Sequence, residues 1–261
     1  MSDLDAAVEA HRAALAARIV TALDQLSPGW SGQRDLGMPP NVEHSLLHHT
    51  LYEARRAEGE RDTARARAAL ALWKTPEPAG ATLLTTALGP VLLTEASRCR
   101  RSEDARFLSP IYTLTGDGGH PGSPPPEDLL RRGTAEIAVS GLGRFVSASL
   151  GIVVLLRRRP PGGTTHSYSV SALPGTAFAD WTAEPHRWGE ILLHESSHSW
   201  LNECLAALRI RLPLHPTWYS EWKQTARPAY GILHAAFAFS LMVQYFDHLA
   251  NAPGVTLPAR R

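Results

Sequence analysis

The sequence has few cysteines and no excess of charge of either sign. Only Cys99 and Cys204 occur in its 261 residues, which is too few for a disulfide framework. Its 26 lysines and arginines nearly balance its 25 aspartates and glutamates. The sequence therefore indicates neither an oxidising compartment nor a global attraction to nucleic acid or to an anionic membrane.

Long apolar runs are missing as well. No run approaches the ~18–20 residues of a membrane span. The N-terminus is acidic, whereas a signal peptide begins with basic residues. We therefore expect a cytoplasmic protein that has neither a membrane nor a nucleic acid as its partner. The sequence gives no indication of the oligomeric state.

The hydrophobic content of 44% is enough to bury a sizeable core, and we expect a single domain over residues 1–261. The patterns predict an α+β fold, mainly α-helical, with a small antiparallel β-sheet in the middle of the chain and a metal site between two C-terminal helices. Four parts follow one another: a helical N-terminal part at about 1–114, a loop at 115–126, the small sheet at about 134–173 and a metal-binding helical part at about 184–250.

Apolar residues at helical spacing predict helices at 4–26, 41–73 and 82–99, and a final long helix from about Pro228 to Leu249. The charged run between Glu53 and Arg67 is expected to form a solvated face of the second helix. The strands of the sheet are predicted from short β-branched segments at 135–139, 151–156 and 167–170.

The strongest chemical signal is the pentapeptide HESSH at residues 194–198, which is an HExxH motif. Side chains at i and i+4 lie about 40° apart around an α-helix, so His194 and His198 can bind one metal ion from the same face. Glu195 lies about 100° from His194, where it can hydrogen-bond a molecule at the metal and act as an acid or a base. Apolar residues flank the motif and indicate a partly buried helix, in which two unpaired imidazoles would be costly.

A third protein ligand is needed to complete such a site, and three residues compete. Glu203 would point to the opposite side of the motif's own helix. Glu221 follows the motif at about the separation at which thermolysin-type zinc endopeptidases place a glutamate. His234 lies in a helix with small residues that would permit close packing, and this context favours His234.

Arg227 provides a second clue, because it precedes Pro228 at the expected start of a helix, where an anion is favoured. The interval from Arg227 to His234 spans roughly 10 Å of helix. Arg227 could therefore hold the far carboxylate of a small diacid whose near end chelates the metal. The alternatives are a surface cation at Arg227 and a core histidine at His234. A second and weaker histidine pair, His44 and His48 beside His49, more simply indicates packing or surface residues.

The motif, the segment Trp218-Tyr-Ser-Glu-Trp222 and the segment Arg227-Pro-Ala-Tyr-Gly-Ile-Leu-His234 together resemble the HExxH-type 2-oxoglutarate-dependent peptide β-hydroxylases of ribosomal peptide natural-product pathways. The resemblance covers mainly residues 186–249. Where the family motif has Trp-Arg, and an Asp before Arg-Pro, this chain has Trp222-Lys223 and Thr225-Ala226.

The resemblance implies Fe(II) at His194, His198 and His234, with 2-oxoglutarate and O₂ as co-substrates. It also implies a precursor peptide as partner, hydroxylated at the β-carbon of an amino-acid side chain. Neutral imidazoles suit Fe(II) as well as Zn, so the ligand set alone does not choose the metal. In this interpretation Glu195 orients a bound molecule from outside the metal's ligand set.

Two other functions remain open. The first is a zinc metallopeptidase in which Glu195 is the general base for a metal-bound water, with Glu221 or His234 as the third ligand. The second is a metal-binding or leader-peptide-binding module without catalysis. A carboxylate as the third ligand would favour the peptidase, and an arginine beside a histidine ligand favours the oxygenase.

Overall fold

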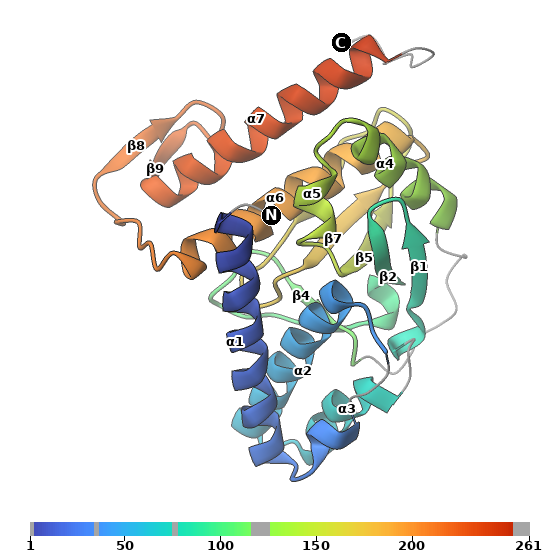
Figure 1. Ribbon diagram of the computed structural model, residues 1–261, viewed down its shortest axis with the longest axis vertical. Helices are drawn as coiled ribbons and strands as arrows, with labels where there is room; N and C mark the ends of the chain where they lie inside the picture. Colours follow the sequence, from blue (N-terminus) through green and yellow to red (C-terminus); the bar gives the residue numbers. More distant parts are fainter. Residues whose placement is uncertain (1–2, 34–36, 75–77, 116–125, 253–261) are drawn as a thin grey trace.

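The computed structural model describes residues 3–33, 37–74, 78–115 and 126–252 (Figure 1). The α-helices in these ranges are α1 (Asp3–Leu26), α2 (Pro40–Glu60), α3 (Thr63–Ala71), α4 (Glu127–Val139), α5 (Gly143–Ser147), α6 (Pro185–Ala207) and α7 (Ala229–Asn251). The strands are β1 (Thr82–Thr86), β2 (Gly89–Glu95), β3 (Arg100–Ser102), β4 (Ile111–Thr113), β5 (Ile152–Arg158), β6 (Ser167–Tyr168), β7 (Thr176–Trp181), β8 (Thr217–Ser220) and β9 (Thr225–Pro228). Most of the predicted loop at 115–126 lies outside the described residues.

A mixed five-stranded sheet, in the order β1-β2-β5-β7-β6, occupies the centre of the fold. β5 pairs in parallel with both β2 and β7, while β1 and β6 are antiparallel edge strands. The prediction of a mainly helical fold with small antiparallel β-structure is therefore confirmed only in part, because β3–β4 and β8–β9 are small antiparallel pairs but the central sheet is mixed. Residues 152–155 of β5 are all buried, and such a run of apolar residues is typical of a strand covered on both faces. Two short hairpins, β3–β4 and β8–β9, lie apart from this sheet.

Alternate side chains of the sheet enter two separate cores, because successive residues of a strand point to opposite faces. One face, with Ile152, Val154 and Phe178, packs against buried residues of α1 and α2. The other face, with Val153, Leu155 and Ala177, packs against α4, α5, α6 and α7. The sheet is thus sandwiched between an N-terminal and a C-terminal helical layer (Figure 1).

Residues 82–99 form the β1–β2 hairpin and a short 3₁₀ helix, so the helix predicted there is wrong. Gly89 has a φ of +109°, and Pro90 follows it. A positive φ favours glycine, and a proline ends or kinks a helix. This pair therefore prevents a continuous helix over residues 82–99. The helical N-terminal part therefore ends well before residue 114.

Residues 135–139 belong to α4 and not to a strand, which corrects a second prediction. The buried side chains of this helix, Leu130, Thr134 and Ile137, recur at helical spacing. Gly133 lies against α6, where an added Cβ would come within 2.7 Å of Trp188 Cβ. Strand β7 was not predicted.

The charged run of α2 and α3 is not simply a solvated face, because it contains a buried ion pair. Glu53 is fully buried, and Arg65 donates to its two carboxylate oxygens at 2.6 and 2.9 Å. The Thr113 hydroxyl donates to Glu53 at 2.9 Å. We call Glu53, Arg65 and Thr113 the Glu53 cluster, which joins α2 and α3 to the β3–β4 hairpin.

Helix α7 packs along α6, and Tyr245, in the C-terminal half of α7, contacts the N-terminal part of α6. The Tyr245 ring is fully buried, and its hydroxyl donates to Glu136 of α4 at 3.0 Å. An added Cβ at Gly189 of α6 would lie 2.0 Å from this hydroxyl. A glycine at position 189 is therefore what allows the Tyr245 side chain to cross α6.

By length and composition α7 could cross a membrane, although no span was expected from the sequence. Its most apolar 18-residue window has a mean hydropathy of 1.3, and 33% of that window is buried. The same composition also suits a helix that packs on a protein core. Here α7 contributes Ala238, Leu241, Tyr245 and Leu249 to the buried apolar residues.

Candidate metal centre

Three histidines from two helices meet at one point of the C-terminal layer. Helix α6 begins with Pro185 in its first turn and carries His194 and His198 one turn apart. Their Nε2 atoms lie 3.1 Å apart. His234 of α7 lies beside them, with its Nδ1 atom 3.0 Å from Nδ1 of His198. The structure therefore brings together the three histidines that the sequence singled out.

The orientation of these rings is that of a hydrogen-bonded chain. His198 directs Nε2 to one neighbour and Nδ1 to the other, and these nitrogens lie on opposite sides of its ring. In the part of the chain that the structure describes, no group of three or more histidine, cysteine, aspartate or glutamate side chains is arranged to hold a metal ion. A shared ion would therefore require at least one ring to turn.

The electrostatic surroundings keep these imidazoles neutral. Burial lowers the pKa of His198 to about 3, with further lowering from His194, His234 and Arg227. The pKa of His234 is lowered to about 4, mainly by burial and to a smaller extent by the positive charge of Arg227. The pKa of His194 is lowered mainly by burial and to a smaller extent by the positive charge of Lys223. Neutral imidazole is the form that offers a lone pair to a metal ion.

Two buried polar atoms at the site have no hydrogen-bond partner among the described residues, His234 Nε2 and Glu195 Oε2. Most buried polar groups in proteins are paired, because an unpaired one costs about 1–3 kcal/mol. The chemistry of three neutral imidazoles, together with these two unpaired atoms, fits a bound cation and a polar molecule next to it.

Glu195 is held from the sheet side. Ser167 of β6 donates to Glu195 Oε1 at 2.6 Å. Burial raises the pKa of Glu195 to about 7, while hydrogen bonds from Ser167 and Ser169 oppose the rise. The carboxyl group is therefore fixed through Oε1, while Oε2 is buried without a hydrogen-bond partner among the described residues.

Arg227 lies in β9, immediately before α7, and lines the same cavity as the three histidines. An added Cβ at Gly231 would lie 2.8 Å from Arg227 Nε, so the guanidinium runs over the first turn of α7. Pro228 is the N-cap rather than the first helical residue. Arg227 thus lies in the same cavity as the histidines, as expected, although it belongs to strand β9 and not to the start of a helix.

A cavity of about 360 Å³ contains these groups. Its lining residues are Phe107, Ser167, Tyr168, Ser169, Val170, Ser171, His194, Glu195, His198, Asn202, Arg227, Tyr230 and His234. A second cavity, of about 930 Å³, adjoins it at Ser167 and His194 and is lined by the exposed Trp222 and by Lys223. His194 can therefore be approached from two cavities.

Asn202 and Tyr230 were missed by sequence reasoning. The Tyr230 hydroxyl donates to Asn202 Oδ1 at 2.7 Å, and the Tyr230 ring lies 4.1 Å from the His234 ring. A signal was available, because Asn202 follows His198 by one helical turn and Tyr230 precedes His234 by one turn. Ser167 had no such signal, since it reaches the site from a distant strand.

The competing ligands lie elsewhere. Glu203 binds Arg12, and its Oε1 atom lies 3.1 Å from His44 Nε2. Glu221 is exposed and sits in the turn between β8 and β9 rather than on a helix. The structure thus separates both carboxylates from the three histidines.

The weaker histidine pair is involved in packing. The rings of His44 and His48 stack edge to face at 4.9 Å. His49 is fully buried, with Nε2 3.0 Å from the Thr176 hydroxyl, and it accepts a hydrogen bond from the Leu114 amide. These contacts agree with the interpretation that favoured packing over metal binding.

No protein-family model matches this sequence, and no curated protein matches it either. The observation that carries most weight is the meeting of three neutral imidazoles with a carboxyl group and a guanidinium in one cavity.

Proposed function

We propose that the chain is an Fe(II)- and 2-oxoglutarate-dependent oxygenase that hydroxylates the β-carbon of an amino-acid side chain in a ribosomally synthesised precursor peptide. The convergence of His194, His198 and His234 in one cavity supports this proposal. With iron bound, one atom of O₂ would enter the substrate C–H bond as a hydroxyl group and the other would enter succinate, while CO₂ leaves. The three imidazoles are the groups that would hold the ion.

Arg227 would bind the far carboxylate of 2-oxoglutarate. Its guanidinium can form two parallel hydrogen bonds with a carboxylate, which fixes the direction of the diacid as well as its position. Lys223 lies close enough to His194 to lower its pKa, and it adds positive charge to the adjoining cavity. Together the two cations favour an anionic co-substrate.

Glu195, Tyr230 and Asn202 would act around the reacting atoms. Ser167 anchors one oxygen of Glu195, and the other oxygen is buried without a partner among the described residues, so a small shift of the side chain would let it accept a hydrogen bond from a bound molecule. The Tyr230–Asn202 hydrogen bond joins α7 to α6 beside His234 and restrains the separation of the two helices. These residues thus orient the ligands and the substrate.

A zinc metallopeptidase is the competing function, and the third ligand separates the two. We expect His234→Ala to lose most of its affinity for Fe(II), because two imidazoles alone make a weak site. Glu221→Ala should keep its metal. The measurement is bound metal in anaerobically purified proteins, with circular dichroism as the control for folding. Metal lost only from Glu221→Ala would refute the three-histidine site.

Co-substrate binding is tested separately. In the presence of Fe(II), Arg227→Ala should bind 2-oxoglutarate at least tenfold more weakly, because it loses a charged bidentate partner, worth ~1.5–3 kcal/mol. Anaerobic titration of the charge-transfer band measures this affinity, and succinate release with a mass gain of one oxygen in the peptide measures turnover. Peptide cleavage without any oxygen-dependent mass gain would favour the peptidase.

A further inference from the structure

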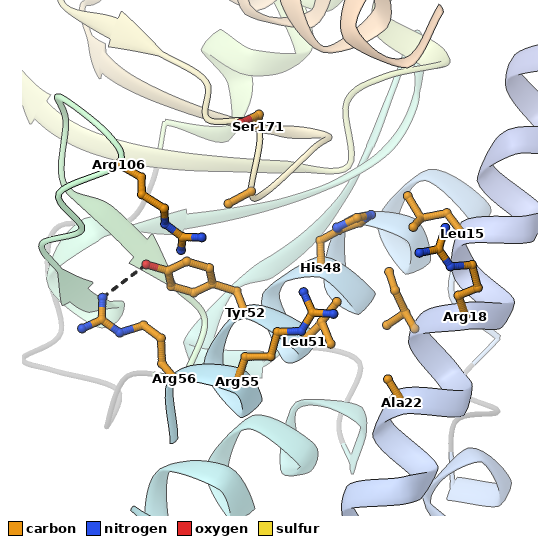
Figure 2. Close-up of a pocket in the computed structure, with 12 residues that line it drawn as sticks. Leu15, Arg18, Ala22, His48, Leu51, Tyr52, Arg55, Arg56, Arg106 and Ser171 are labelled. Atoms are coloured by element: carbon orange, nitrogen blue, oxygen red, sulfur yellow. Dashed lines mark hydrogen bonds between the residues drawn. The ribbon is translucent and has the colours of Figure 1, made fainter. Parts of the chain in front are cut away.

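A third cavity, of about 530 Å³, lies between α1, α2 and the 171–172 segment, and arginines dominate its lining. Its charged residues are Arg18, Arg55, Arg56 and Arg106. We call this cavity the arginine pocket. Figure 2 shows guanidinium groups entering this space from three different parts of the chain, Arg18 from α1, Arg55 from α2 and Arg106 from the β3–β4 connection.

The positive charge of the arginine pocket is only partly compensated. Among the described residues that line it there is no aspartate or glutamate. Arg56 pairs with Glu60 at 3.0 Å, and Arg106 pairs with Asp104 at 2.7 Å. Within the described ranges, Arg18 and Arg55 have no carboxylate partner. Like charges facing one cavity repel each other, so an anionic ligand would stabilise this arrangement.

Polar groups other than arginines also face this cavity. His48 lines it and has a buried Nε2 atom without a hydrogen-bond partner among the described residues. The Tyr52 hydroxyl is not available to a ligand, because it donates to Asp104 Oδ2 at 3.2 Å and accepts from Arg56 at 3.4 Å. The donors that the pocket offers to a carboxylate are therefore mainly those of Arg18 and Arg55.

The arginine pocket is connected to the histidine site. A cavity of about 390 Å³ lies between them. It shares His48 and Ser171 with the arginine pocket, and it shares Ser169, Asn202 and Tyr230 with the cavity of the three histidines. The segment from Ser169 to Ser171 lines the histidine cavity and the connecting cavity, and Ser171 also lines the arginine pocket. A ligand that reaches both ends must be elongated.

We propose that the arginine pocket binds an acidic segment of the peptide substrate, whose chain then passes along the Ser169–Ser171 segment to the histidines. Several carboxylates on one flexible chain match several separated guanidinium groups, whereas a single small anion would meet only some of them. This inference rests on the proposed function for the identity of the ligand as a peptide, but the binding itself requires neither metal nor turnover.

The test uses the full-length, metal-free chain and a fluorescein-labelled hexaglutamate peptide, followed by fluorescence anisotropy. A hexaglutamine peptide of the same length is the matched probe without charge. The double variant Arg18→Gln/Arg55→Gln removes the two arginines without carboxylate partners. Arg132→Gln/Arg157→Gln is the control variant, because these exposed arginines lie on α4 and β5, away from the pocket.

We expect the hexaglutamate peptide to bind, the hexaglutamine peptide not to bind, and the Arg18/Arg55 variant to bind the acidic peptide about tenfold more weakly. The control variant should stay within about twofold of the parent chain, and binding should weaken with salt. Equal losses in both double variants, or no binding of the acidic peptide by the parent chain, would overturn the inference. Binding of tripolyphosphate without binding of the peptide would overturn it as well and would identify a phosphate site.

Peptide binding and metal uptake, measured on the same variants, distinguish this inference from the proposed function. His198→Ala should bind the acidic peptide as the parent chain does, since His198 does not line the arginine pocket. If the peptide binds with this dependence on arginine while the histidines take up no metal, the proposed function fails and the acidic-peptide site stands. If the histidines take up metal but peptide binding does not depend on the arginines, the acidic-peptide site fails and the proposed function stands.

Discussion

Two buried polar clusters differ in how completely their atoms are paired. In the Glu53 cluster, both carboxylate oxygens of Glu53 accept hydrogen bonds from Arg65, and one also accepts a bond from Thr113. In the histidine site, Glu195 Oε2 and His234 Nε2 are buried without partners among the described residues. The two glutamates are similarly buried, yet only the first has its charge neutralised within the protein.

This difference is the one expected between a structural cluster and a site that binds a ligand. Burial of a charge costs several kcal/mol unless it is paired, so the Glu53 cluster is complete only as a unit. At the histidine site the protein tolerates the cost of unpaired atoms, as is common where a ligand provides the missing partners. Each of the following predictions tests this contrast.

The largest effect is expected at the Glu53 cluster. Glu53→Gln should lower the free energy of unfolding by about 3–5 kcal/mol, because it leaves the Arg65 charge buried without its main partner. Urea denaturation measures the change. Glu60→Gln is the matched control, since Glu60 binds the same arginine but is half-exposed, and its loss should cost at most about 1 kcal/mol. Equal losses in the two variants would contradict the structural role.

The second effect concerns a buried histidine outside the site. Burial lowers the pKa of His49 to about 3, below the 6.5 of an unfolded histidine. The unfolded chain therefore binds a proton that the folded chain excludes, so stability is lost as the pH falls below 6.5 towards 3. Between pH 7 and pH 5 this loss amounts to about 2 kcal/mol from His49.

Urea denaturation at both pH values tests this expectation. The parent chain should lose about 2 kcal/mol more between pH 7 and pH 5 than His49→Gln does, since glutamine does not titrate in this range. A change with pH that is the same in both proteins would mean that His49 is protonated in the folded state.

A smaller effect is expected at Glu195. Ser167→Ala should cost about 1 kcal/mol, because Glu195 Oε1 loses one donor while Ser169 remains near. Glu195→Gln should change the stability by less than about 1 kcal/mol, because Oε2 has no partner to lose. The measurement is again urea denaturation. If Glu195→Gln were as destabilising as Glu53→Gln, the contrast between the clusters would disappear.

The smallest effect on stability is expected at Gly231. Gly231→Ala should change the free energy of unfolding by about 0.5 kcal/mol or less, since the three nearest atoms all belong to the flexible guanidinium of Arg227. The displaced guanidinium should nevertheless weaken the binding of 2-oxoglutarate. Gly59→Ala in α2 is the matched control, because an added Cβ there meets nothing within 4 Å. Equal 2-oxoglutarate affinity in both variants would show that Arg227 does not depend on Gly231.

The long helices could be predicted from the sequence, but the sheet could not. Helices α1 and α7 begin and end close to the predicted residues, because their apolar spacing continues over many turns. The apolar residues of the segment 82–99 occur in short runs, so their period does not distinguish a helix from a hairpin. Its Gly89-Pro90 pair was the better evidence. Parallel pairing of β5 depends on contacts between distant segments, which local patterns do not contain.

At the site, the three histidines and Arg227 were identified because helical spacing and local motifs relate them to one another. Ser167 could not be found in this way, since only the packing of β6 beside α6 brings it to Glu195. The burial of Glu53 was missed for a similar reason. A charged sequence is usually solvated, and the partner that permits burial, Arg65, lies on the next helix.

The contact between Tyr245 and Gly189 determines the position of a histidine that neither residue touches. Tyr245 follows His234 by 11 residues in α7, a separation of about 16 Å along the helix axis. Because a straight helix transmits a shift along its axis, the fit of Tyr245 over Gly189 sets how far His234 extends past His198. A side chain at position 189 would displace α7 and misalign the third histidine from a distance, so the register of two helices is itself part of the site.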